Sequence, residues 1–343
     1  MLSRACSRQA IKEEQMGGKK GISEARLKLI YQRQDKPRWG KHYVPSILAT
    51  PQEAPSISRA ATLTPSKVGG RDFSTLSTPE QAFSLLGLYH PWVKDIHEQK
   101  MLSPEPRPHP LYGYPGFPGV GLPPIKGVID VAERLGCMRV LPRVRVKGQG
   151  GDGKGFSVPF PYVGDLLLYI HKPKTDRVYC VNWSIKGKAG DFKRPMSSNW
   201  RGRGREKKVQ AVLVRHEIEK IYYLDVQIRT LHLSGEDFDP NLFANLRQLF
   251  LDHRHRVSIS EERREEIVSR FQSALEAGVP PMDVIARLTG AGHLTAEECR
   301  ICLNQAIWNR QLRVDLFSPI VFDRPLRPEE RDVTQMYFEW FKE

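Results

Sequence analysis

Long hydrophobic runs are missing from this sequence, and cysteine is scarce. No apolar stretch approaches the roughly 18 residues that a transmembrane helix needs, and the opening residues, MLSRACSRQAIKEEQM, lack the apolar core of an export signal. The 5 cysteines are odd in number and scattered, which does not fit a disulfide framework. We therefore expect a cytoplasmic protein with reduced thiols and no membrane partner.

Acidic residues are also too few to balance the basic ones. The chain has 53 Lys and Arg residues against 39 Asp and Glu residues, a net charge of +14 over 343 residues. Such a surplus favours a polyanionic partner, because binding releases the counterions of the polyanion. Nucleic acid is therefore the favoured partner. The 40% hydrophobic content predicts folded cores, and the length allows two or three domains.

The first 75 residues are rich in turn-forming sequence. One short basic helix is predicted at Ser23 to Gln34, and the rest, as in RWGKHYVPSILATPQEAPS, has no regular period. We expect residues 1–75 to form an extended basic N-terminal arm and not part of a core.

Residues 76–234 predict an α/β domain. Thr78 and Gln81 resemble a capping box and Pro79 suits the first turn, so a helix is expected from Pro79 to about Tyr89. Residues 103–127 carry so much Pro and Gly that only a loop is plausible. Strands are expected at 92–102, 138–146, 163–170, 178–186 and 221–233, and a second helix at 206–220.

From residue 235 to 343 the pattern is helical. Helices are expected at 241–253, 261–277, 281–288 and 296–310, followed by short strands at 312–316 and 319–322. This order, with a two-stranded ribbon after the last long helix, is typical of a winged helix-turn-helix.

One hairpin has the residue types of a metal-dependent nuclease. The stretch YVGDLLLYIHKPKTDRVYCVNWSIKGK (162–188) predicts two antiparallel strands, which would bring Asp165 at the start of the first close to Lys186 at the end of the second. Asn182 and Ser184 share a strand face with Lys186. A carboxylate beside a lysine suits Mg²⁺-dependent phosphodiester cleavage. The alternative is an ordinary surface strand with a solvated lysine.

Four groups of residues, in order along the chain, resemble TnsA, the endonuclease subunit of heteromeric transposases. The resemblance covers most of the chain. Its residues are Gly40-Lys41 with Tyr43 and Pro45, Glu80 at the start of its helix, Asp95-Ile96 with Glu98-Gln99, and the hairpin from Asp165 to Lys186.

The resemblance implies a restriction-endonuclease-like PD-(D/E)xK α/β domain over 76–234, followed by an all-α winged-helix-like domain over 235–343. It assigns Glu80 as the helix-borne catalytic acid, Asp165 as the metal-binding aspartate and Lys186 as the catalytic lysine. Glu219 matches a possible additional acid. The implied cofactor is Mg²⁺, with Mn²⁺ as a substitute, held by Glu80, Asp165 and the carbonyl of Ile185.

The implied activity is hydrolysis of one DNA strand, on the 5′ side, at transposon ends. A TnsB-like DDE transposase would cut the other strand, and a TnsC-like AAA+ ATPase would dock on the C-terminal domain. The implied setting is the bacterial cytoplasm.

Ser184 is where the sequence departs from the family. It stands among the catalytic positions, two residues before Lys186, where related nucleases carry Glu and TnsA can carry Gln. A hydroxyl is a weaker Mg²⁺ ligand than a carboxylate. This leaves open a catalytically silent DNA-binding assembly subunit, and also a plain DNA-binding regulator.

A basic stretch after the hairpin predicts contact with DNA. It combines cations with a tryptophan that could stack on a base; the alternative is a solvated loop. The expected DNA-binding residues are Lys41, Lys193, Arg194, Trp200, Arg201, Arg203, Arg205, Lys207 and Lys208. Arg300, Asn304 and Asn309, on the polar side of the last long helix, could also read a DNA groove or meet a protein.

Cys299 and Cys302 have the C-x₂-C spacing of a zinc site, but we interpret them differently. They fall with Leu303 and Ala306 on one helical face, behind a capping box of Thr295 and Glu298. A zinc site needs two more ligands, and His293 alone is insufficient. A buried helix face is the expectation.

Overall fold

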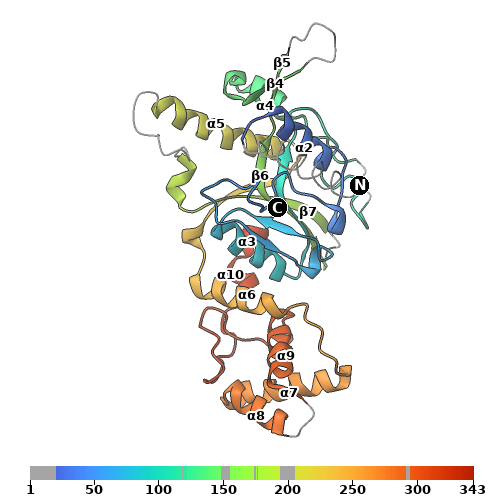
Figure 1. Cartoon of the computed structure of the whole chain (residues 1–343), viewed down its shortest axis with the longest axis vertical. Coiled ribbons are helices and arrows are strands. Elements are labelled where there is room, and N and C mark those ends of the chain that lie inside the picture. The colour runs from blue at the N-terminus through green and yellow to red at the C-terminus, as the bar shows by residue number, and fades with distance from the viewer. Residues whose placement is uncertain are drawn as a thin grey trace, which may run out of the picture. The chain divides into compact units, whose positions relative to one another are not determined.

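The computed structural model describes residues 21–117, 119, 121–147, 155–173, 175, 177–193, 205–290 and 294–343, with the side chains of 205–208 excepted. The chain divides into two compact units (Figure 1). The first runs to Gln81 and again from Trp92 to Ser234, with Glu343; the second is Ala82–Pro91 and Gly235–Lys342. No helix among the described residues has both the length and the apolar character needed to cross a membrane.

A four-stranded mixed sheet lies at the centre of the first unit, in the order β3-β6-β7-β8. The strands β3 (Val93–Leu102), β6 (Tyr162–Lys172) and β7 (Arg177–Lys186) are antiparallel neighbours, and β8 (Arg229–Ser234) runs parallel to β7. Parallel strands need a crossover connection, and helix α5 (Arg205–Leu224) lies in that connection. The expected α/β character and the predicted hairpin are confirmed.

Helix α5 covers one face of this sheet. Leu167, Tyr169 and Cys180 of the sheet pack in one core with Ile218 and Tyr222 of the helix. Our prediction of a strand over 221–233 is wrong at its start, because α5 continues to Leu224 and β8 begins only at Arg229. Tyr222 follows Ile218 by four residues, a spacing that keeps both side chains on the buried helix face.

Helix α3 (Thr78–Tyr89) starts in the first unit and belongs to the second from Ala82 onward. Its capping residue is Ser77, not Thr78 as we expected. The Glu80 N–H donates to Ser77 Oγ at 3.3 Å, while the Glu80 carboxylate accepts from the N–H of Leu76 at 2.9 Å and from the Ser77 hydroxyl at 3.0 Å. The carboxylate of Glu80 is a stronger acceptor than the amide of Gln81, which we expected in this role, and a negative charge is favourable at a helix N-terminus.

The expected extended arm over 1–75 is wrong for its described part, residues 21–75. Helix α2 (Glu24–Gln34) forms as predicted, with Ser23 as its N-cap. The side chains of Ile30, Tyr43 and Phe73 are nevertheless buried. Short elements follow α2, namely η1 (Gly40–His42), β1 (Ala61–Leu63), η2 (Ser66–Val68) and β2 (Phe73–Thr75). The sequence did not predict this burial, because the buried side chains of this turn-rich segment do not recur with the period of a helix or a strand.

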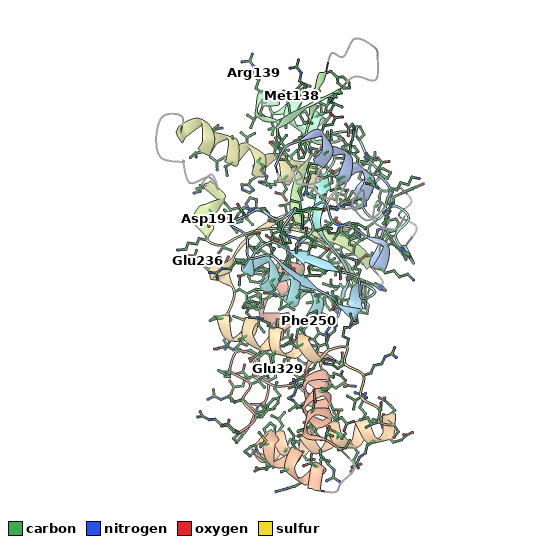
Figure 2. The ribbon with its side chains drawn as sticks, viewed as in Figure 1. Met138, Arg139, Asp191, Glu236, Phe250 and Glu329 are labelled. Atoms are coloured by element: carbon green, nitrogen blue, oxygen red, sulfur yellow. The ribbon has the colours of Figure 1, made fainter. Side chains whose placement is uncertain are left out.

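The segment between β3 and β6 is folded over much of its length. Residues 103–127 contain no named helix or strand in the described part, as predicted, although Arg107 and Ile125 form an isolated bridge. Helix α4 (Val128–Arg134) was not predicted. The strand expected over 138–146 is instead η3 (Met138–Val140), labelled at Met138 and Arg139 in Figure 2, followed by β4 (Arg143–Val146), which pairs with β5 (Phe156–Pro159).

The second unit contains the four predicted helices. They are α6 (Pro240–Asp252), α7 (Glu261–Ala277), α8 (Pro281–Gly290) and α9 (Ala296–Trp308), with η5 (Gly235–Asp237) before them and α10 (Val333–Met336) and α11 (Phe338–Phe341) after them. The C-x₂-C pair is buried on α9 behind the expected capping box of Thr295 and Glu298.

The predicted ribbon after α9 is wrong. Residues 312–316 and 319–322 are not strands, and Val314 forms only an isolated bridge with Pro328. In this segment the buried side chain of Asn245 makes the hydrogen bonds to the backbone that a neighbouring strand would otherwise make. Its amide donates to the carbonyls of Leu316 and Ser318 at 2.9 and 2.8 Å, and its oxygen accepts from the Ile320 N–H at 3.1 Å. Backbone groups satisfied in this way need no ladder.

Candidate active site

Asp165 and Lys186 meet at one end of the β6–β7 hairpin, as predicted. Leu166 pairs with Trp183, which puts Asp165 beside the last residues of β7. The Ile185 N–H donates to Asp165 Oδ2 at 2.6 Å, and Lys186 Nζ lies 3.7 Å from the same oxygen. Both side chains are about 15% exposed, at 15% and 14%. The carboxylate is therefore fixed by a backbone donor and close to a cation.

Both strands are irregular at the level of Asp165. Gln99 of β3 lies opposite it, between the pairs Glu98–Leu166 and Lys100–Gly164, and has a left-handed φ of 49°. Gly164 faces α5, since an added Cβ would lie 3.2 Å from Glu219 Oε1. Leu167 also packs with α5, although an odd spacing should place it on the other face. The strand therefore changes face around Asp165.

Glu80 is hydrogen-bonded to Gln99, the β3 residue that lies opposite Asp165. The Gln99 amide donates to Glu80 Oε2 at 2.9 Å, in addition to the two donors from the helix cap. Burial and the nearby charge of Asp165 raise the pKa of Glu80 to about 7, while Lys186 acts in the opposite direction. The two acids and the lysine predicted from sequence are thus electrostatic neighbours.

These residues fit a magnesium ion in part. Asp165 Oδ1 accepts no hydrogen bond from any described residue, whereas Glu80 already accepts three of the roughly four that a carboxylate takes. The Ile185 N–H points to Asp165, and in a strand the carbonyl of the same residue points to the same side. Within the described chain, no three His, Cys, Asp or Glu side chains form a metal-binding group. A metal here would need carbonyl and water ligands, which Mg²⁺ accepts.

Ser184 of β7 and Glu219 of α5 form a buried cluster between the sheet and the helix. The Ser184 hydroxyl donates to Glu219 Oε2 at 3.4 Å, and the Asn182 amide donates to Glu219 Oε1 at 3.0 Å. Burial, with the charge of Asp165 in addition, raises the pKa of Glu219. The family resemblance places Ser184 among the catalytic positions, but its hydroxyl donates to Glu219.

A cluster of aromatic rings lies beside the Lys186 ammonium. Its Nζ lies 5.9 Å from the ring centre of Phe192, in η4 (Ala189–Lys193), and that ring stacks on His232. His216 of α5 packs against both rings. Burial and the neighbouring charge of Lys186 lower the pKa of His216 to about 3, so the imidazole is neutral. Sequence reasoning missed both histidines, because no motif connects them to the hairpin.

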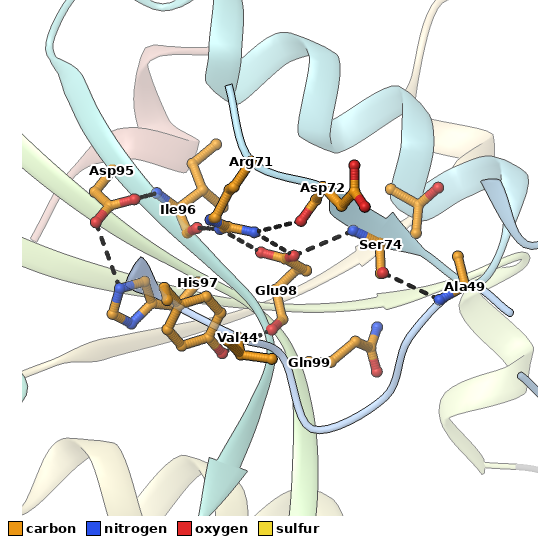
Figure 3. A network of polar contacts seen from close by, with 12 residues as sticks. Val44, Ala49, Arg71, Asp72, Ser74, Asp95, Ile96, His97, Glu98 and Gln99 are labelled. Carbon is orange, nitrogen blue, oxygen red and sulfur yellow. Dashed lines mark hydrogen bonds and ion pairs between the residues drawn. The ribbon is translucent and has the colours of Figure 1, made fainter. Parts of the chain in front are cut away.

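Two of the remaining family-like residues, Gly40 and Tyr43, bond to β3, whose Asp95 and Glu98 are labelled in Figure 3. The Gly40 N–H donates to Asp95 Oδ2 at 2.7 Å, and the Tyr43 hydroxyl donates to the Glu98 carbonyl at 2.8 Å. Figure 3 shows Arg71 bound to the buried Glu98 carboxylate by two hydrogen bonds, of 2.6 and 2.7 Å. These contacts fasten the 40–71 segment to the strand that carries Gln99. Sequence reasoning missed Arg71.

The structure describes few of the residues that we expect to bind DNA. Lys41 and Lys193 are exposed. Arg194, Trp200, Arg201 and Arg203 lie outside the described residues, as do the side chains of Arg205, Lys207 and Lys208.

The prediction that Asn304 lies on the polar side of the last long helix, α9, is wrong. Asn304 is fully buried and donates to Asp252 Oδ2 at 2.7 Å, and Arg300 pairs with the same carboxylate. Asn309 is the C-cap of the helix. Asn304 therefore holds the second unit together and does not lie on a groove-reading surface.

Comparison with known proteins adds no family assignment. No family model matches the chain, and no curated protein is significantly similar to it.

Proposed function

We propose that the first unit is a Mg²⁺-dependent, TnsA-like DNA endonuclease that cuts one strand, on the 5′ side, at transposon ends during cut-and-paste transposition. The observation that carries this proposal is the convergence of Asp165 and Lys186, which the hairpin pattern predicts, with Glu80, which the family resemblance assigns. The order helix, three antiparallel strands, helix and parallel strand is compatible with a restriction-endonuclease-like domain. A DDE transposase would cut the other strand.

Each residue has a defined task in this proposal. Asp165 offers a carboxylate oxygen that no described residue bonds, and the Ile185 N–H holds that carboxylate in place. Lys186 places a cation where negative charge develops on the phosphate, which favours the transition state. Bound Mg²⁺ would polarise the phosphate and lower the pKa of a water ligand. Glu80 must lose its proton before it can contribute a charged oxygen to a metal.

The basic residues would hold the DNA. Lys41, Lys193 and the basic residues from 194 to 208 supply charge without sequence specificity, so their contribution should weaken with salt. The helical second unit would be the docking surface for the AAA+ ATPase.

Strand cleavage of an end-labelled transposon-end duplex tests the proposal. The assay contains the cognate transposase and either Mg²⁺ or Mn²⁺, and compares wild type with Asp165→Ala. We expect wild type to nick one strand and Asp165→Ala to lose about 10²-fold or more of that rate. Asp191→Ala is the matched control, because Asp191 (labelled in Figure 2) is another carboxylate of the first unit, and its one hydrogen bond with a described residue is from the nearby Lys188 N–H. Equal rates for wild type and Asp165→Ala would refute the proposal.

A second candidate is a catalytically silent, DNA-binding assembly subunit. Two observations favour it: the Ser184 hydroxyl is bonded to Glu219, and Glu80 already accepts three hydrogen bonds. Metal-dependent melting separates the candidates, since a ligand that binds only the folded state stabilises it. A nuclease should melt higher in Mn²⁺ in a way that Asp165→Ala abolishes. A silent subunit should show no such increase, yet still support cutting by the transposase.

A further inference from the structure

The first unit contains a cavity that the proposed nuclease site does not use. It measures about 70 Å³ and lies between the 34–39 segment, the start of the Pro/Gly loop and the sheet. At about 10–15 Å³ for each water molecule, it has room for about five. Its lining includes Trp39, His97, Lys100, Ser103, Arg107 and Tyr169.

Lys100 brings an ammonium without a bonded partner to this cavity. The residue is partly buried, and its Nζ forms no hydrogen bond or ion pair with any residue that the structure describes. Its one contact is with the Tyr43 ring, whose centre lies 5.4 Å from Nζ and which also has the Arg71 guanidinium 5.0 Å away. Burial lowers the pKa of Lys100 to about 8, so most molecules still carry the charge at neutral pH. Asp95 attracts this ammonium but does not bond it, and a desolvated ammonium is more favourable when an anion bonds it directly.

Arg107 supplies a second donor to the same space. Its Nη1 carries both contacts with Asp35, to Oδ1 at 2.8 Å and to the carbonyl at 2.9 Å, and its Nε donates to Ser103 Oγ at 3.2 Å. No contact with a described residue uses Nη2. The guanidinium is therefore held in one orientation with a terminal nitrogen left over.

The other charged groups of the cavity leave it positive. Arg38 also lines it and is exposed, and Asp35 is the one carboxylate among the lining residues. Burial lowers the pKa of His97 to about 4, so its ring is neutral. The pKa of His109 is lowered by burial as well. Lys100, Arg107 and Arg38 therefore outnumber Asp35, which is itself paired with Arg107. Asp95, outside the lining, contacts His97 and attracts Lys100 from a distance.

We propose that this cavity binds a small tetrahedral oxyanion of the phosphate type, held by Lys100 Nζ and Arg107 Nη2. The volume suits an ion of about five heavy atoms better than a larger acid. Charge-assisted hydrogen bonds from a lysine and an oriented arginine are the strong contacts that such an ion takes. The ion is either free phosphate or the phosphate of a mononucleotide, for which Trp39 offers a ring beside the site. This assignment does not depend on nuclease activity.

Calorimetric titration of the full chain with inorganic phosphate tests the proposal. The buffer contains no phosphate or sulfate, and ionic strength is matched with chloride. Wild type should bind saturably at one site, Lys100→Met should weaken the affinity at least tenfold, and Arg107→Gln should weaken it less. Lys342→Met, which removes a partly exposed lysine of the second unit that pairs with Glu339, is the control and should bind like wild type. No saturable binding, or equal binding by Lys100→Met, overturns the proposal.

A second measurement excludes a purely structural lysine. Without phosphate, Lys100→Met should melt at or above the wild-type temperature, because it loses a desolvated charge. A large decrease would mean that Tyr43 already stabilises the ammonium, and would overturn the proposal. Titration with a nucleoside monophosphate identifies the source: tighter binding than phosphate indicates a nucleotide, and equal binding indicates the free ion. Lys100-dependent competition by duplex DNA would show a DNA-backbone contact instead, and would overturn it.

Discussion

The side-chain amide of Gln99 donates a 2.9 Å hydrogen bond to Glu80 from a backbone held at a φ of 49°. For a residue with a Cβ, this left-handed conformation costs about 1 kcal/mol. The strained residue lies opposite Asp165 in the sheet. Backbone strain of this kind gathers at functional sites, where the surrounding structure enforces it. The strain and the candidate active site therefore coincide.

Replacing Gln99 by Gly and by Ala separates the strain from the hydrogen bond. Both variants lose the amide, but only glycine adopts the left-handed backbone freely. We expect Gln99→Gly to be more stable than Gln99→Ala by about 1 kcal/mol in urea unfolding. Equal stabilities would mean that the backbone at this position relaxes at no cost.

The raised pKa of Glu80 predicts a pH-dependent stability. The folded-state pKa is about 7 against an ordinary 4.5, so the folded state holds a proton that the unfolded state has lost. Stability from this group should therefore fall as pH rises from about 4.5 to about 7, by at most about 3 kcal/mol. Glu80→Gln cannot titrate, and its stability should change less over that window.

Comparison of the two pH profiles isolates Glu80. Glu98 and Glu219 also have raised pKa values, but both are present in wild type and in the variant. Denaturant titrations at several pH values measure the difference. Parallel profiles for wild type and Glu80→Gln would contradict the raised pKa.

Ser184→Glu restores the residue type of related nucleases, yet the structure predicts a cost. The Ser184 hydroxyl points to the fully buried Glu219, so the change would bring two carboxylates together without solvent. We expect a loss of about 2 kcal/mol or more at pH 8, which shrinks at pH 5 as one carboxyl becomes protonated. Ser184→Gln, of similar size but uncharged, is the control and should show no such pH dependence. Equal losses for both variants at pH 8 would indicate crowding alone.

The buried Arg71–Glu98 pair predicts a strong asymmetry between single and double variants. Arg71→Met leaves the Glu98 carboxylate, which is 0% exposed, without its cation, and should cost about 3–5 kcal/mol. Adding Glu98→Gln removes the stranded charge while keeping an acceptor for the Ser74 N–H. The double variant should recover part of the loss in guanidinium unfolding. A double variant that is less stable than Arg71→Met would contradict this interpretation.

The hairpin of Asp165 and Lys186 could be predicted because it is local. Two apolar strands with a short polar connection fix their own register, and the register places both side chains together. The helices of the second unit were predictable for a similar reason, since each carries its own period and caps.

The remaining features depend on contacts between distant segments. The burial of Tyr43 depends on β3, more than 50 residues away in sequence, and the missing ribbon after α9 depends on the single side chain of Asn245. Ser184 and Asn182 follow the regular alternation of β7 toward Glu219. The irregularity lies in β6, where Gly164 and not Asp165 faces Glu219, and no residue type announces such a change of face. The secondary-structure propensity of a short segment does not depend on such distant contacts and therefore cannot predict these features.

The sheet topology also sets an order of assembly. The paired residues of the β6–β7 hairpin are close in sequence, as in Lys172 and Arg177. The paired residues of β3 and β6 are far apart in sequence, as in Val93 and Ile170. Closing the longer loop costs more chain entropy, and non-local pairing slows folding. The hairpin should therefore form before β3 docks, so Asp165 and Lys186 would be neighbours early and Glu80 would join only with Gln99. Refolding measured with hydrogen-exchange labelling should then protect β6 and β7 before β3.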